Sequence, residues 1–422
     1  MADLRAAAQG RARIAPAAVT GPRAALRLIG SRNFGPFFFG NAASATGTWF
    51  QNLAAALFVY RATHSAFLLG VLAFSTFVPV LLLAPWTGSA ADRFDRRRLL
   101  LATQIAATVL TGTLAVLTWA GLAHVWLVML FSVGLGVATA FATPAAFALI
   151  GGLVPREELG SAVALNSMTY NVARAIGPLL AALTVAQLGI AAAFAVNSAS
   201  YLALVVGVLV VHAAPRRALA RGESRLRESL ALVAARPALL ASLVIVTAVG
   251  FASDPVNTEA PAFAHAFGKP DTYAGFIIGA FGAGAVTAAF FLAGRVTGSR
   301  RRMALTLGLL GGGLVAFCLM QVFPVALGVL VVAGFGYLAS STSATSRLQL
   351  GVEEHLRGRM MALWSVAFLG LRPVASLVDG AIAQAFGVRV AGVVLALPAL
   401  AGAAAILVVE RRRSSYSALT DY

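Results

Sequence analysis

The stretch 88–97 reads G-S-A-A-D-R-F-D-R-R and stands between two long apolar runs, one ending at Thr87 and the other beginning at Leu99. A short charged segment between two apolar runs is typical of a loop between membrane-spanning helices, because roughly 20 apolar residues of helix cross a hydrocarbon core. We therefore expect a charged hairpin here, with the chain on both sides of it embedded in lipid.

The composition of the whole chain agrees with a lipid environment. Of the 422 residues, 59% are hydrophobic and 11% are charged, and the mean hydropathy is +0.86. So few polar residues cannot cover a soluble globule of this length. Backbone amides have no water partner in lipid, so long unbroken apolar runs indicate spanning helices. Twelve such runs predict an all-α membrane protein with spans at about 34–60, 67–87, 99–122, 125–153, 162–188, 191–211, 238–263, 273–297, 303–322, 325–346, 360–386 and 391–409.

The positions of the basic residues predict the orientation, because positively charged loops are retained on the cytoplasmic side. Of 32 Lys and Arg residues, Arg61, Lys269 and Arg389 lie in loops after odd-numbered spans and two lie within spans. The other 27 lie in the tails and the even-numbered loops, so we expect both termini on the cytoplasmic side. The net charge of +17 is then a topology signal, and arginines scattered over short segments beside a membrane predict no nucleic-acid site.

A polar segment divides the chain into two halves of six spans each. Within it, Leu226, Leu230 and Val233 fall on one helical face, as in a helix that lies on the membrane surface. Short matches between the fifth and eleventh spans indicate duplication of a six-span unit, with chance similarity among alanine-rich spans as the alternative. The predicted division is a basic tail at 1–32, a first half at 33–212, a linker at 213–237, a second half at 238–410 and a tail at 411–422.

The charged hairpin resembles the loop signature G-x-x-x-D-R-x-x-R-R of the major facilitator superfamily, and the resemblance covers about 28–409. Gly88, Asp92, Arg93, Arg96 and Arg97 occupy the signature positions. Within the superfamily, the chain resembles the enterobactin-exporter-like branch of bacterial drug and siderophore exporters, the transmembrane secretion effector type. This resemblance implies two pseudo-symmetric six-helix halves in a bacterial cytoplasmic membrane, latched together on the cytoplasmic side by the hairpin. A purely topogenic role for its arginines is the alternative.

The fifth span resembles the glycine-rich pattern of superfamily antiporters that ends in G-P-x-x-G-G. It keeps Gly177 and Pro178 and has alanines in place of the other glycines. Small residues let helices approach closely, and a proline bends a helix by removing a hydrogen bond. The pattern predicts a sealed interface between the halves, with generic helix packing as the alternative.

Five ionisable residues lie within the spans, where a charge is costly and is usually kept to face a cavity or a partner. They are Arg174, Asp254, Glu259, Arg372 and Asp379. We expect Asp254, near the midplane, to carry a proton, because a desolvated carboxylate can load and release one. The alternative for Asp254 is a permanent ion pair with an arginine of a neighbouring span, and the alternative for Glu259 is a wetted position at the helix end. Arg174 matches the N-x-A-R-x-x-G-P of the branch, whereas Arg372 and Asp379 depart from it.

Uncharged polar residues predict the wall of a substrate cavity. Asn41, Thr48 and Gln51 fall mainly on one face of the first span, and Asn171 and Asn257 lie in the fifth and seventh spans. The resemblance implies that the first, fourth, seventh and tenth spans line a central cavity, which gives most of these side chains a destination. Bonding to the backbone of their own helices is the alternative.

The residues needed for an enzyme are missing from the sequence. It has no histidine pair at ligand spacing and no G-x-x-x-x-G-K-[ST] phosphate loop, so we expect no metal and no cofactor. The sequence favours a monomeric secondary transporter that couples protons to efflux of an amphipathic small molecule, such as a siderophore, an antibiotic or a dye. A facilitative or proton-coupled importer and a membrane sensor that moves no cargo are the alternatives.

Overall fold

The computed structural model describes residues 22–212, 226–292, 299–353 and 356–420, and the described residues form helices and contain no strand. A short helix, α2 (Pro22–Ile29), precedes the first half of the molecule. This first half consists of α3 (Gly35–Thr63), α4 (Ala66–Arg93), α5 (Arg96–Trp119), α6 (Val125–Leu153), α7 (Leu159–Leu188) and α8 (Ile190–Val210). The second half follows α9 (Leu226–Ala235) and consists of α10 (Pro237–Thr258), α11 (Ala260–Ala266), α12 (Ala274–Leu292), α13 (Arg300–Leu319), α14 (Phe323–Leu350), α15 (Arg357–Ser365), α16 (Arg372–Phe386) and α17 (Val388–Thr420).

The predicted all-helical membrane fold is confirmed. Eleven helical segments among the described residues are long and apolar enough to cross a membrane. The twelfth span, α3, has 29 residues and a more polar sequence that includes Asn41, Gln51 and Asn52. Its polar residues are tolerated because α3 packs closely against α7 and α8 inside the first half.

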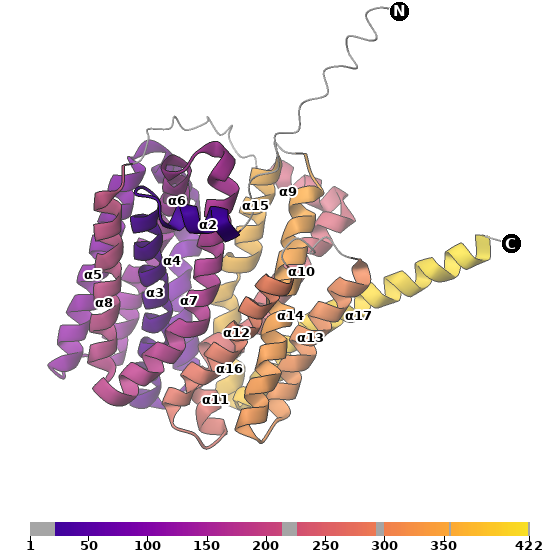
Figure 1. Cartoon of the computed structure of the whole chain (residues 1–422). Helices are drawn as coiled ribbons and strands as arrows, with labels where there is room; N and C mark the ends of the chain where they lie inside the picture. The colour runs from indigo at the N-terminus through magenta and orange to yellow at the C-terminus, as the bar shows by residue number, and fades with distance from the viewer. Residues whose placement is uncertain (1–21, 213–225, 293–298, 354–355, 421–422) are drawn as a thin grey trace, which may run out of the picture.

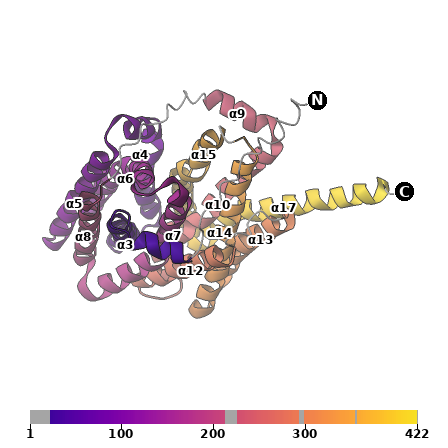
Figure 2. The same ribbon diagram turned by 45° about the horizontal axis from the view of Figure 1, so that its top comes forward.

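The two halves lie side by side, and their helices run in similar directions (Figures 1 and 2). One end of the bundle, which we call the Arg-rich face, carries α2, α9 and the C-terminal ends of the even-numbered spans (Figure 1). The opposite end, the Arg-poor face, carries α11 and the loops after odd-numbered spans. Across the interface between the halves, α4 packs against α16 and α7 packs against α12.

The predicted hairpin at 88–97 is shorter than expected, and this part of the prediction is wrong. Helix α4 continues to Arg93 and α5 begins at Arg96, so Phe94 and Asp95 alone connect them. The helix outlasts the apolar run because alanine and arginine are good helix formers, and it ends where Asp95 caps the next helix. The Asp95 side chain accepts a hydrogen bond from the Arg98 amide at 2.8 Å.

The seventh and eleventh spans were expected to be continuous helices, but both are interrupted. The seventh span changes from α10 to α11 at Glu259, and the eleventh has a π-helical stretch, Val366–Gly370, before α16. Pro261 and Pro373 each lie in the first turn of the new helix. A proline has no N–H to continue the preceding helix, and its ring restricts the residue before it. The interruptions place Glu259 and Arg372 at helix starts.

The linker helix α9 contacts the second half along part of the expected amphipathic face. Val233 is buried and packs with Leu239, Leu348 and Val352, whereas Leu230 is 51% exposed. One edge of α9 therefore rests on the second half and Leu230 lies outside this contact, so the position of α9 on the membrane surface stays a prediction. Residues 213–225 of the linker and most of the 1–32 tail lie outside the described residues.

Glycines allow α4 and α16 to approach closely. A Cβ added at Gly70 would come within 2.4 Å of the Ser376 carbonyl oxygen, and one at Gly380 within 3.0 Å of the Ala66 carbonyl oxygen. We expect Gly70→Leu to separate these helices and to destabilise the protein by about 1–3 kcal/mol, the usual cost of overpacking. Thermal unfolding in detergent measures the effect. Gly308→Leu is the control, because a Cβ at Gly308 meets open space, and equal midpoints for the two variants would contradict the prediction.

Candidate functional site between the halves

A small central cavity of about 70 Å³ lies between the two halves. Its wall is built by α3, α4, α6 and α8 from the first half and by α10, α12 and α16 from the second. Four of the residues singled out from the sequence line it: Thr48, Gln51, Asn257 and Arg372. The cavity therefore brings together side chains that are far apart in the chain.

Asp254 and Arg372 form a buried ion pair beside this cavity. The Arg372 Nε lies 3.7 Å from an Asp254 carboxylate oxygen, and the Asp254 side chain is 1% exposed. The Thr258 hydroxyl donates a hydrogen bond to the other Asp254 oxygen at 3.1 Å. The Arg372 guanidinium also lies over the Phe77 ring of α4, 4.5 Å from its centroid, so the ion pair contacts both halves. The ion pair that the sequence left as an alternative for Asp254 is thus present.

Glu259 and Asp379 are buried near this pair without partners of their own. Both are 0% exposed. Among the described residues, no hydrogen-bond partner reaches either oxygen of either carboxyl group. Glu259 lies within electrostatic range of Asp254 and Asp379, and Asp379 within range of Asp254. The wetted position considered for Glu259 is therefore wrong, because the start of α11 is covered by neighbouring helices.

These three carboxyl groups form an acid cluster with a single arginine, Arg372, in ion-pair contact among the described residues. One cation balances one carboxylate. An uncompensated charge in a dry interior is strongly unfavourable, so the remaining carboxyl groups are suited to holding protons. Such a cluster next to a cavity can exchange protons when the cavity is hydrated.

Arg174 lies in a second cluster, made of aromatic rings from both halves. Its guanidinium carbon is 4.3 Å from the ring centroid of Tyr337, 5.2 Å from that of Phe281 and 5.4 Å from that of Trp49. The sequence predicted Arg174 as a functional residue but missed these rings and Phe77. Aromatic residues are common in apolar spans, so only their position relative to an arginine distinguishes them. We call Trp49, Phe281 and Tyr337 the aromatic cage.

The sequence of this bundle matches one known family over most of its length. The pattern described as "Transmembrane secretion effector" fits residues 25–419. The chain belongs to this family of major facilitator transporters. Its family and fold are those of a multi-pass membrane transporter rather than an enzyme.

Several curated relatives of the transporter carry informative names. It is 29% identical to the staphyloferrin A transporter of Staphylococcus aureus over 42% of this chain and 45% of that protein. It is 26% identical to macrolide efflux protein A of Streptococcus pyogenes over 53% and 56%. The chain thus spans about half the length of these relatives. It is 27% identical to the enterobactin exporter EntS of Shigella boydii over 79% and 84%.

Solved structures confirm the fold of the transporter. A bacterial homologue of the human lysosomal transporter Spinster superposes with a TM-score of 0.70 at 15% identity, covering 89% of this chain and 96% of that one. The nucleoside transporter NupG superposes with a TM-score of 0.68 at 14% identity, covering 91% and 99%.

The other predicted cavity residues of the transporter lie in different surroundings. Gln51 accepts a hydrogen bond from Asn197 at 3.1 Å, and the Thr48 hydroxyl lies 3.3 Å from that of Tyr201. Asn41 donates to Asn166 of α7 at 2.8 Å, and Asn171 donates to the Ser167 carbonyl of its own helix at 2.8 Å. Neither Asn41 nor Asn171 lines the central cavity. Their polar groups form hydrogen bonds within the first half, and a role for these two asparagines in cargo binding stays a prediction.

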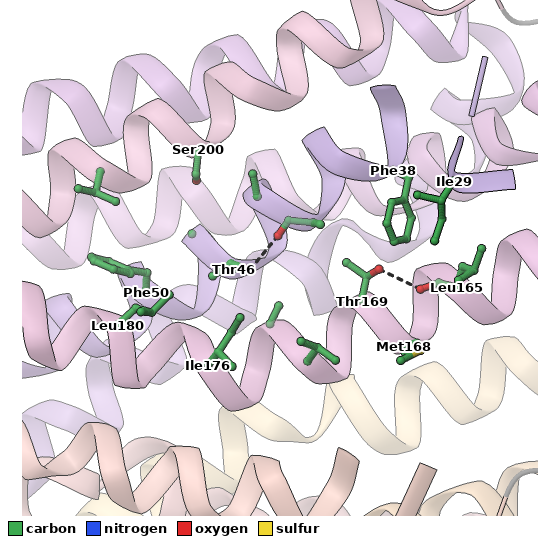
Figure 3. Close-up of a pocket in the computed structure, with 16 residues that line it drawn as sticks. Ile29, Phe38, Thr46, Phe50, Leu165, Met168, Thr169, Ile176, Leu180 and Ser200 are labelled. Carbon is green, nitrogen blue, oxygen red and sulfur yellow. Dashed lines mark hydrogen bonds between the residues drawn. The ribbon is translucent and has the colours of Figure 1, made fainter. Parts of the chain in front are cut away.

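A larger groove of about 510 Å³ lies inside the first half of the transporter, between α3, α7 and α8. Figure 3 shows Ile29 and Phe38 at one end of it and Phe50 and Leu180 at the other. Its lining is mostly apolar, and none of the site residues predicted from the sequence belongs to it. We therefore take the central cavity as the candidate site.

The arginines after α4 contact their own half of the transporter. Arg97 donates to the carbonyl oxygens of Val208 and Leu209 at 2.9 and 2.6 Å, and Arg96 reaches the Ala148 carbonyl at 3.4 Å. Cations commonly satisfy the free carbonyls at a helix C-terminus in this way. These contacts hold α5 against α8 and do not reach the second half. The side chains of Gly88, Asp92 and Arg93 lie outside the described residues.

Gly177 and Pro178 contribute to two different interfaces of α7. A Cβ at Gly177 would lie 2.8 Å from the Thr46 carbonyl oxygen, so this glycine packs α7 against α3 within the first half. The Pro178 carbonyl lies 2.7 Å from the Cβ position of Gly275 in α12, across the interface between the halves. The sealed interface expected from this motif is therefore wrong for Gly177, because that face of α7 points into its own half.

The two halves of the transporter are held together at the Arg-poor face. Arg61 of α3 donates two hydrogen bonds to the Asp271 carboxylate, at 2.5 and 3.0 Å. Nearby, the Gln384 side chain accepts hydrogen bonds from the Ser65 hydroxyl and the Phe67 amide at 3.0 and 3.4 Å. These hydrogen bonds and this ion pair join the two halves at the Arg-poor face. The structure is thus closed at the Arg-poor face.

Removing the Arg61–Asp271 pair should shift the transporter towards a state that is open at the Arg-poor face. The Arg61 side chain is 42% exposed, so we expect a loss of about 1 kcal/mol, or roughly a fivefold change in the ratio of closed to open molecules. Spin labels at Ala62→Cys and Lys269→Cys report the distance between the halves. Arg301→Ala is the control, because its ion pair with Glu410 lies within the second half. Unchanged distances in Arg61→Ala would refute the role of this pair.

Proposed function

We propose that the transporter is a secondary active exporter that moves an amphipathic small molecule out of the cell in exchange for protons, by alternating access. Three features support this reading. The family is one of membrane transporters, the central cavity lies between two halves that are bridged at the Arg-poor face, and the acid cluster adjoins that cavity. The acid cluster is the observation that carries the proposal, because a transporter without proton coupling has little use for three buried carboxyl groups.

The cluster gives the exchange a simple electrostatic basis. Arg372 both lines the cavity and pairs with Asp254. A cargo molecule that donates hydrogen bonds from the cavity to the carboxylates of the cluster stabilises their charged form, so cargo and protons compete for the same oxygens. Cargo binding on one side of the membrane then favours release of a proton, and proton uptake on the other side favours release of the cargo.

The orientation follows from the distribution of arginines. With the Arg-rich face and both termini in the cytoplasm, the Arg-poor face is external. The hydrogen bonds at the Arg-poor face then close the external side of the transporter. We further propose the bacterial cytoplasmic membrane as the location, a monomer as the working unit, and two rigid halves, 33–212 and 238–410, joined by the 213–237 linker.

The relatives guide the choice of cargo for a test. Their names include a siderophore transporter, a siderophore exporter and a macrolide efflux protein. Staphyloferrin A, enterobactin and a macrolide therefore form the first panel. The mixed polar and aromatic lining of the central cavity suits an amphipathic cargo.

Flux measurements in inside-out membrane vesicles test the function. An imposed acid lumen should drive the exported member of the panel into the lumen, and collapse of the pH gradient should stop this accumulation. A facilitator would equilibrate the cargo regardless of the gradient, and a proton-coupled importer would drive it out of the lumen. A sensor would bind cargo and give no flux. Any of these three outcomes contradicts the proposal.

A further inference from the structure

Arg174 is a buried cation that has no counter-ion among the described residues. The residue is 4% exposed, and in the part of the chain that the structure describes no ion pair or hydrogen bond reaches its guanidinium, whose Nε is sealed and unpaired. Rings of the aromatic cage attract a cation, but this attraction is weaker than the cost of taking the charge out of water. The charge of Arg174 is therefore only partly balanced.

Two arginines of the second half, Arg372 and Arg389, show how a guanidinium group is balanced in this protein. Arg372 is paired with Asp254. Arg389 donates to the carbonyl oxygens of Cys318, Met320 and Ala266 and lies over an aromatic ring as well. Arg174 has rings but no oxygen. The difference indicates that an oxygen acceptor from outside the chain completes the site.

A second unpaired donor lies in the same cage. The indole Nε1 of Trp49 is buried and has no acceptor among the described residues. The Trp49 ring is 5.4 Å from the Arg174 guanidinium carbon, and Trp49 also lines the central cavity. Two buried N–H donors without acceptors, close together and next to a cavity, form a site for an anionic oxygen.

We propose that Arg174 and Trp49 bind the anionic group of the cargo, and that the cargo is an organic acid with a planar apolar body. This inference rests on the proposed function, since it names the chemical class that the exporter carries. Tyr170, one helical turn before Arg174, has its ring 6.0 Å from that of Trp49 and is 51% exposed, so it offers an aromatic face to the apolar body.

The position of the cage explains how binding reaches both halves. Trp49 and Arg174 belong to α3 and α7 of the first half, while Phe281 and Tyr337 belong to α12 and α14 of the second. An anion that draws Arg174 towards the cavity weakens its contacts with the two rings of the second half. Ligand binding is thereby linked to the contact between the halves.

Calorimetric titration of the full-length protein in lipid nanodiscs tests the site with three probes of matched size. These are 1-naphthoate, neutral 1-naphthamide and cationic 1-naphthylmethylammonium, with empty nanodiscs correcting for partition into lipid. We expect wild-type protein to bind naphthoate at least tenfold more tightly than naphthamide and to bind the cation least. Equal affinities for naphthoate and naphthamide would overturn the proposal.

Two variants of Arg174 and one of Trp49 locate the effect. Arg174→Gln should remove the preference for naphthoate over naphthamide, and Arg174→Lys should keep most of it. Trp49→Phe keeps a ring but removes the N–H, and should weaken naphthoate binding several-fold without changing naphthamide binding. If Arg174→Gln still binds naphthoate more tightly than naphthamide, the proposal is refuted. If Arg174→Gln does not fold, the same decision rests on Trp49→Phe.

The binding assay needs no gradient, so it separates this inference from the proposed function. Naphthoate binding that depends on Arg174, together with no proton-driven flux, would support the anion site and refute the proposed export function. Proton-driven flux with an anion preference that ignores Arg174 would refute the site alone.

Discussion

Asp254→Asn is expected to reduce proton-driven export by at least about a hundredfold while the protein still reaches the membrane and binds cargo. Asparagine is close to aspartate in size and can still accept the hydrogen bond that Thr258 donates at 3.1 Å. It cannot bind and release a proton, so the acid cluster loses the member that contacts Arg372. A hundredfold loss corresponds to a barrier increase of roughly 3 kcal/mol, which is in the range for removing a group that acts directly in a proton-transfer step.

Inside-out vesicles with an acid lumen measure this effect for the exported cargo. Glu158→Gln is the matched control, because Glu158 pairs with Arg27 at the Arg-rich face, within the first half and away from the cavity. The control should retain near wild-type export. If Asp254→Asn retains proton-driven export, the proton is carried elsewhere, and Glu259→Gln and Asp379→Asn would then be the next variants to measure.

Arg372→Gln is expected to have the largest effect on stability. It leaves Asp254, Glu259 and Asp379 buried together without the one arginine in ion-pair contact with the cluster. Removing one partner of a buried pair typically costs about 3–5 kcal/mol, because the remaining charge is uncompensated. The double variant Asp254→Asn, Arg372→Gln removes both charges and should recover most of this loss, without recovering export.

Thermal unfolding in detergent and the yield of protein in the membrane measure the loss and its recovery. Arg301→Gln is the control, because the Arg301 side chain is 75% exposed and its ion pair lies at the surface of the second half. A single variant Arg372→Gln as stable as wild type would show that the cluster does not need this cation. A double variant no more stable than the single one would show that the pair is not the source of the loss.

The sequence determined the solvent and the architecture. Apolar runs of spanning length can be recognised in the sequence itself. In lipid every backbone amide must bond within its own helix, so the apolar side chains identify the segments that lie in the membrane. The same reasoning singled out the ionisable residues within the spans, because a charge in lipid is costly and is usually kept to face a partner or a cavity. These residues are Arg174, Asp254, Glu259, Arg372 and Asp379. The residues of the charged stretch 88–97 identified the superfamily. The connection between α4 and α5 is shorter than this charged stretch, because helix covers most of it.

Only the tertiary structure decided which of these charges meet. Asp254 and Arg372 lie 118 positions apart in the chain, and nothing local to either span selects the other as its partner. The aromatic cage around Arg174 likewise draws its rings from three different helices. Hydropathy and helical periodicity show on which face of its own helix a residue lies. Its counter-ion or ring contact depends on how other helices pack against that face, and this is a property of the whole bundle. The prolines Pro261 and Pro373 favour the helix breaks at Glu259 and before Arg372, but which side chains meet at these breaks depends on the packing of the whole bundle.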